Sequence, residues 1–165
     1  MRVSGNILDR KGSLKLYSKS VIKLLSDIGQ KLKFDVRTEC NTGLGSIDLI
    51  WFTKIDHPNN TKYMLPVVGF EIETSNRTRK HLKGDILNLI NLSCSLGVIV
   101  LVERGFDRTK GKARKDFEGN KRAIEKYVKS LAGVANLQVW TASDVEKLFN
   151  KIFETNQRYF NQQFF

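Results

Sequence analysis

The fold is decided by residues 64–74, which read MLPVVGFEIET. The segment is rich in β-branched and aromatic side chains, so it is predicted to form a largely buried strand. Side chains alternate between the two faces of a strand, which places Phe70 and Ile72 on one face and Glu71 and Glu73 on the other. Two carboxylates are therefore expected about 7 Å apart on one side of an otherwise apolar strand.

The segment before this strand repeats the pattern in shorter form. Residues 46–52 (SIDLIWF) also predict a strand, with Asp48 inside an apolar run. The turn-forming residues NTGLG at 41–45 connect it to an alternating stretch at 35–40, so the two strands are expected to form a hairpin. Burying a carboxylate without a partner is costly, and acids in two neighbouring core strands are explained if they share a cation. The alternative is that each acid faces solvent or pairs with Lys or Arg.

Hydrophobic periodicity predicts the remaining elements. Apolar residues recur at three- and four-residue steps over 14–32, which indicates an amphipathic helix with Ser13 as its N-cap. Ser143 and Glu146 have capping-box spacing at the start of a last helix. The further predictions are a loop over 55–61, helices over 78–94 and 112–131, a central strand over 96–102 and a last strand over 136–141. For the tail, 156–165, an edge contact, a dimer contact and fraying all stay open.

This order of elements favours the α/β class in a single domain over 1–165, with a mixed central β-sheet of about five strands flanked by helices. The charge is strongly positive: 28 Lys and Arg stand against 17 Asp and Glu, a formal net charge of +11. Such an excess attracts polyanions, either nucleic acid or an anionic membrane surface. No apolar run reaches the roughly 18–20 residues that span a bilayer. The first residues do not resemble a signal peptide, so we expect a soluble, cytoplasmic protein without membrane contact.

The chain has few Cys and His residues that could bind a metal ion. The chain has two Cys and two His, and their spacing matches no zinc site or disulfide framework. A metal ion would need oxygen ligands, which favours Mg²⁺ or Mn²⁺ as the cofactor.

The acids and the order of elements together resemble a known group of enzymes. The sequence IDLI at 47–50, then GFEIE at 69–73, a helix and an apolar strand are similar to the PD-(D/E)XK nuclease superfamily, which includes type II restriction endonucleases and Holliday-junction resolvases. The resemblance covers roughly residues 13–102. It implies a restriction-endonuclease-like fold in which Asp48 is the first motif acid and Glu71 the second. It also implies metal-dependent hydrolysis that leaves 5′-phosphate and 3′-hydroxyl ends.

Glu73 departs from this pattern, because the superfamily usually has Lys at the third position. A Glu there would bind a second metal ion or orient the attacking water. Lys80 and Lys83 on the following helix are candidates to replace the missing cation; the alternative is that both are solvated or contact phosphates. Glu39, opposite Asp48 in the hairpin, is either a further acid of the metal site or an exposed strand residue. The predicted catalytic set is Asp48, Glu71, Glu73, Lys80 and Lys83, and the predicted metal ligands are Asp48, Glu71, Glu73 and Glu39.

Basic residues follow the acidic strand and recur between Arg104 and Lys129. The predicted nucleic-acid contacts are Arg77, Arg79, Arg108, Lys110, Lys112, Arg114 and Lys115. Binding through such a segment should weaken steeply with salt, whereas the alternative is a merely solvated charged helix.

These observations predict a metal-dependent DNA endonuclease, of restriction-endonuclease-like or junction-resolving type. The alternative is a catalytically inactive DNA-binding subunit on the same fold. A structural protein that binds RNA or an acidic partner through its basic face would leave the strand acids unexplained. The chain shows no separate recognition domain, so a homodimer or a partner subunit is expected.

Overall fold

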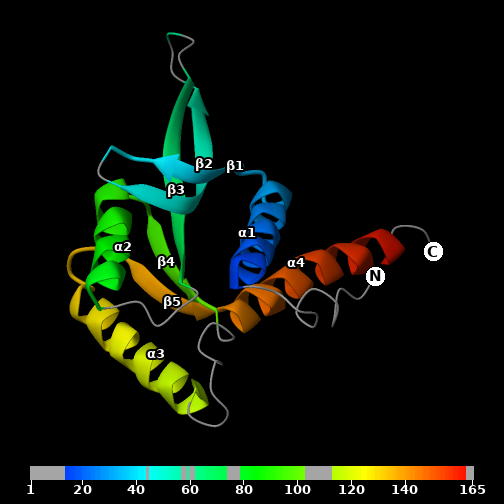
Figure 1. Cartoon of the computed structure of the whole chain (residues 1–165). Coiled ribbons are helices and arrows are strands. Elements are labelled where there is room, and N and C mark those ends of the chain that lie inside the picture. Colours follow the sequence, from blue (N-terminus) through cyan, green and yellow to red (C-terminus); the bar gives the residue numbers. More distant parts are fainter. Residues whose placement is uncertain are drawn as a thin grey trace.

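The structure, a computed structural model, describes residues 14–43, 45–56, 59, 62–73, 79–102 and 113–162. Within these residues it contains a mixed five-stranded sheet and four helices (Figure 1), so the predicted α/β class is confirmed. In chain order the elements are α1 (Leu14–Lys31), β1 (Asp35–Asn41), β2 (Ser46–Asp56), β3 (Lys62–Glu73), α2 (Arg79–Leu92), β4 (Leu96–Leu101), α3 (Ala113–Ser130), β5 (Leu137–Thr141) and α4 (Ala142–Gln162).

The strands lie in the sheet in the same order as in the chain, β1-β2-β3-β4-β5. The first three form an antiparallel meander, and β4 and β5 continue the sheet parallel to β3. Parallel neighbours need a crossover connection, and α2 and α3 lie in the two crossovers. The predicted central strand is β4, which is paired on both edges and buried from Gly97 to Leu101.

The helices cover the two faces of the sheet in pairs. On one face, α1 and α4 pack over a core formed with Leu49, Trp51, Phe70 and the even-numbered residues of β4. On the other face, α2 and α3 pack over Ile50, Ile99 and Leu101. Each helix buries an apolar stripe and leaves its polar side to solvent. Among the helices of the described residues, none is long and apolar enough to cross a membrane.

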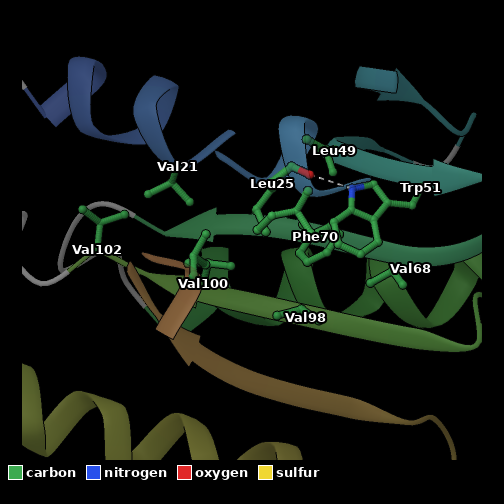
Figure 2. Packing of buried hydrophobic residues seen from close by; sticks show 11 residues of the cluster. Val21, Leu25, Leu49, Trp51, Val68, Phe70, Val98, Val100 and Val102 are labelled. Carbon is green, nitrogen blue, oxygen red and sulfur yellow. Dashed lines mark hydrogen bonds between the residues drawn. The ribbon is translucent and has the colours of Figure 1, made fainter. Parts of the chain in front are cut away.

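Trp51 belongs to the core under α1 and α4, where it lies beside Leu25 and Phe70 (Figure 2). Its side chain is 4% exposed, and its indole Nε1 donates a 3.1 Å hydrogen bond to the carbonyl oxygen of Leu25 on α1. The Phe70 ring meets the Trp51 ring edge-on, with 4.8 Å between the ring centroids. Trp140, which is partly buried, packs against the same cluster from β5.

The predicted N-cap of the last helix is wrong. The helix begins at Ala142, and the capping pair is Thr141 with Asp144 rather than Ser143 with Glu146. The Asp144 N–H donates to Thr141 Oγ1 at 3.2 Å, and the Thr141 N–H donates to Asp144 Oδ2 at 2.9 Å. This is the reciprocal geometry of a capping box. It lies two residues earlier because β5 continues into α4 without a loop.

The predicted loop over 55–61 is too long. Strand β2 continues to Asp56 and β3 resumes at Lys62, with Ile55 paired to Tyr63. Strand β1 pairs with β2 only as far as Phe52, so the tip of this hairpin extends past its neighbour and projects from the sheet (Figure 1). The tail is also more regular than the sequence suggests, since α4 continues to Gln162.

Candidate metal centre

Asp48 and Glu71 lie where β2 and β3 separate. The ladder between these strands begins at Leu49 and Phe70, so the next residues outward are Asp48 and Glu71. Beyond this point the side chain of Asp48 contacts the backbone of β3. Its Oδ2 accepts a 2.7 Å hydrogen bond from the Ile72 N–H. The carboxylate is thereby held against β3, beside Glu71.

The strands are distorted at this point. Leu49 and Trp51 belong to the core under α1 and α4, but Ile47 belongs to the core under α2 and α3, so the alternation of β2 changes at Asp48. Across the hairpin Thr38 pairs with Leu49 and Cys40 with Ile47, which places Glu39 opposite Asp48. Glu39 has a φ of 51°, in the left-handed region that non-glycine residues rarely adopt.

Glu71 is a buried acid among other acids. It is 6% exposed, and its Oε1 accepts a 3.4 Å hydrogen bond from Nδ2 of Asn88 on α2. Burial, the charge of Asp48 and the charge of Asp85 raise the pKa of Glu71 to about 9, while the Asn88 donor acts in the opposite direction. Desolvation is the first cause, because it disfavours the charged form of any carboxyl group. Without a cation, Glu71 therefore holds a proton at neutral pH.

Asp85 and Asn88 are site residues that the sequence analysis missed. They stand three residues apart on α2, each directly before an apolar residue that packs on the sheet, Ile86 and Leu89. Residues with this spacing share a helix face. Two polar side chains beside the apolar stripe of α2 were a usable signal for a site, whereas only the lysines of this helix were predicted to contribute to it.

The other two predicted acids, Glu73 and Glu39, lie in different environments. Glu73 is buried at 6% exposure, and its backbone carbonyl accepts a 2.9 Å hydrogen bond from the Val102 N–H at the end of β4. Glu39 is exposed. Among the described residues, no three His, Cys, Asp or Glu side chains are grouped closely enough to hold a metal ion. The close pair is Asp48 with Glu71, and the roles of Glu73 and Glu39 stay predictions.

The predicted cations are only partly described. The Lys83 ammonium lies over the Tyr127 ring of α3, 5.8 Å from the ring centroid. Arg77, Arg108, Lys110 and Lys112 lie outside the described residues, and the side chains of Arg79, Lys80, Arg114 and Lys115 do as well, although their backbones belong to α2 and α3. The described part of α3 adds exposed Arg122, Lys126 and Lys129.

The pair of carboxylates fits magnesium better than a larger cation. Mg²⁺ keeps several waters and is commonly bound through one or two carboxylates plus substrate phosphate, whereas Ca²⁺ needs six to eight oxygen ligands. Asp48 and Glu71 supply two such carboxylates next to each other, and an acidic pair that must otherwise retain a proton gains from a cation.

No known protein family, curated protein or solved structure matches the chain.

Glu71 should make the metal-free protein less stable in alkali. Its pKa is about 9 in the folded chain and close to 4.5 when unfolded, so the folded state binds one more proton between these values. The contribution of Glu71 to the free energy of unfolding should therefore be fully present below pH 4.5 and fall as pH rises towards 9. Urea denaturation in EDTA at pH 5, 7 and 9 measures this. Glu71→Gln, which needs no proton, should show a flatter profile, and an equal slope in both proteins would contradict the assignment.

Proposed function

We propose that this protein is a Mg²⁺-dependent endodeoxyribonuclease that hydrolyses phosphodiester bonds. The observation that carries the proposal is the placement of Asp48 and Glu71. Both come from an apolar sheet, both lie at the separating ends of β2 and β3, and Glu71 is almost fully buried. Two adjacent acids in such a place cost stability unless they serve a cation.

The order of elements supports the same proposal. A helix, a three-stranded antiparallel meander, a helix and a strand parallel to the third one follow each other, and the acids lie on the second and third strands. This is the order on which the resemblance to the PD-(D/E)XK nucleases rests. In that resemblance Asp48 and Glu71 are the metal-binding acids.

The proposed chemistry gives each acid a separate task. Asp48, held by the Ile72 N–H, and Glu71, held by Asn88, would hold the ion from β2 and β3. A bound Mg²⁺ ion would polarise the phosphate and make a water molecule more acidic. Glu73, two residues further along β3, orients or deprotonates the attacking water. Substrate is held by the basic residues on α2, α3 and the segment before α3, consistent with the net charge of +11.

The competing proposal is a catalytically inactive DNA-binding subunit on the same fold. Two observations favour it: Glu73 stands where the resemblance calls for Lys, and the described residues contain no group of three metal-binding side chains. Both proposals predict salt-sensitive DNA binding. They differ in whether the acids bind a metal ion.

Plasmid cleavage distinguishes the two proposals. Supercoiled plasmid and branched DNA are incubated with the protein in Mg²⁺, in Mn²⁺ and in EDTA, beside a Glu71→Gln control. Metal-dependent nicking or linearisation that the substitution removes supports the nuclease, and the better substrate separates a restriction-like from a junction-resolving activity. Tight binding without cleavage of either substrate favours the inactive subunit. Light scattering with and without DNA tests the proposed homodimer, which a purely monomeric mass would contradict.

A further inference from the structure

We propose that Asn88 is a positioning residue that holds the Glu71 carboxylate for the metal ion, and that Gly45 is glycine to leave space for Asn88. This inference rests on the proposed metal-dependent function and assigns two residues that the resemblance does not include. Asn88 lies on α2, Glu71 on β3, and Gly45 directly precedes β2. The three therefore come from separate parts of the chain.

The amide of Asn88 bridges two of these elements. Its Nδ2 lies 3.4 Å from the Ser46 carbonyl oxygen and 3.4 Å from Glu71 Oε1. A backbone carbonyl only accepts hydrogen bonds, so the side of the amide that faces Ser46 must be the nitrogen. The second hydrogen of the same nitrogen is then available to Glu71, which accepts it. Asn88 thus fixes one carboxylate oxygen of Glu71 relative to the start of β2.

The position of α2 makes this bridge possible. The helix packs closely on β3 at Gly69, where a methyl group would lie 2.7 Å from Leu92 Cδ2 and 3.0 Å from Leu89 Cδ2. Asn88 is one turn before Leu92, so it lies on the side of α2 that approaches the sheet. A larger residue at 69 would push α2 away from the sheet. The hydrogen bond from Asn88 to Glu71, which is already 3.4 Å long, would then lengthen.

Gly45 completes the arrangement. A methyl group there would lie 2.7 Å from Asn88 Cγ and 2.8 Å from Asn88 Nδ2, which is too close for either atom to remain. Gly45 has no positive φ, in contrast to Gly43 at 81°, so its backbone accepts alanine. Because the atoms in the way are the end of one side chain, Gly45→Ala should displace the Asn88 amide at little cost to folding.

Direct titration with Mn²⁺ tests the inference without requiring DNA cleavage. Affinity is measured by calorimetry for the wild type, Asn88→Ala, Gly45→Ala and the double variant, with circular dichroism melting as the folding check. Removing a residue that orients a metal ligand commonly weakens affinity about 10–100-fold, and we expect this for both single variants. The double variant should bind no more weakly than Asn88→Ala alone, because the added methyl no longer meets an amide. Gly84→Ala, which adds the same methyl to α2 where nothing lies within 4 Å, is the matched control and should bind as the wild type does.

The outcomes separate the two proposals. Wild-type affinity in folded Asn88→Ala and Gly45→Ala proteins overturns the positioning role and leaves the metal site standing. If the losses of Mn²⁺ affinity in the two single variants multiply in the double variant, the positioning role is also overturned. If Asn88→Ala does not fold, Gly45→Ala alone decides the question. A wild-type protein that binds no Mn²⁺ and cuts no DNA overturns the proposed function, and the positioning role with it.

Discussion

Asp48→Asn is expected to lower the proposed metal-dependent DNA cleavage by about 10²–10³-fold, because a proposed carboxylate ligand worth several kcal/mol in the transition state is lost. The fold should survive. An amide oxygen at this position can still accept the 2.7 Å hydrogen bond from the Ile72 N–H. Losing the charge also relieves the repulsion that raises the pKa of Glu71. The metal-free variant should therefore be at least as stable as the wild type at pH 8.

Cleavage rates and urea denaturation, measured on the same preparations, check both parts of this expectation. Asp48→Ala is the companion variant. It removes the ligand and also leaves the Ile72 N–H without its acceptor, which should cost about 1–3 kcal/mol of stability. Both variants should show the reduced cleavage, but only the alanine variant should be less stable. An active Asp48→Asn protein would exclude Asp48 as a metal ligand.

Phe70→Ala is expected to cost about 3–5 kcal/mol, the usual loss for removing a buried aromatic side chain. Phe70 is fully buried and lies between two tryptophan rings, 4.8 Å from the Trp51 centroid and 6.0 Å from the Trp140 centroid. Its removal should leave a cavity in the core beside β2, β3 and β5. A loss of this size is a large part of the 5–15 kcal/mol by which typical domains are stable.

The urea midpoint of Phe70→Ala measures this loss, with Leu87→Ala as the control. Leu87 is a large apolar residue on α2 that is 54% exposed, so its truncation should change stability by no more than about 0.5 kcal/mol. Phe70→Leu should fall between the two, because it retains part of the apolar volume. Equal midpoints for Phe70→Ala and Leu87→Ala would mean that Phe70 is not the centre of this core.

Local periodicity was sufficient to predict the elements and their order. Alternation in MLPVVGFEIET predicts a strand with Phe70 on the side of the core and the acids opposite, and the structure has Phe70 fully buried in that core. The observed bounds of the elements differ from the predicted bounds where contacts between elements determine them. Ile55 and Asp56 are in β2 because residues of β3 pair with them, and the last helix is capped at Thr141 because β5 leads directly into it.

The sequence by itself determined the α/β class, the positions of the strands and the presence of acids in two of them. These follow from patterns with a period of two or 3.6 residues, which depend on the neighbours along the chain. Only the tertiary structure decided which groups meet. The separation of β2 from β3 brings Asp48 to the Ile72 N–H, and the close approach of α2 at Gly69 brings Asn88 to Glu71. These contacts join residues 17 and 24 positions apart, and no local pattern specifies them. They arise from packing, in which the whole core sets the position of each helix.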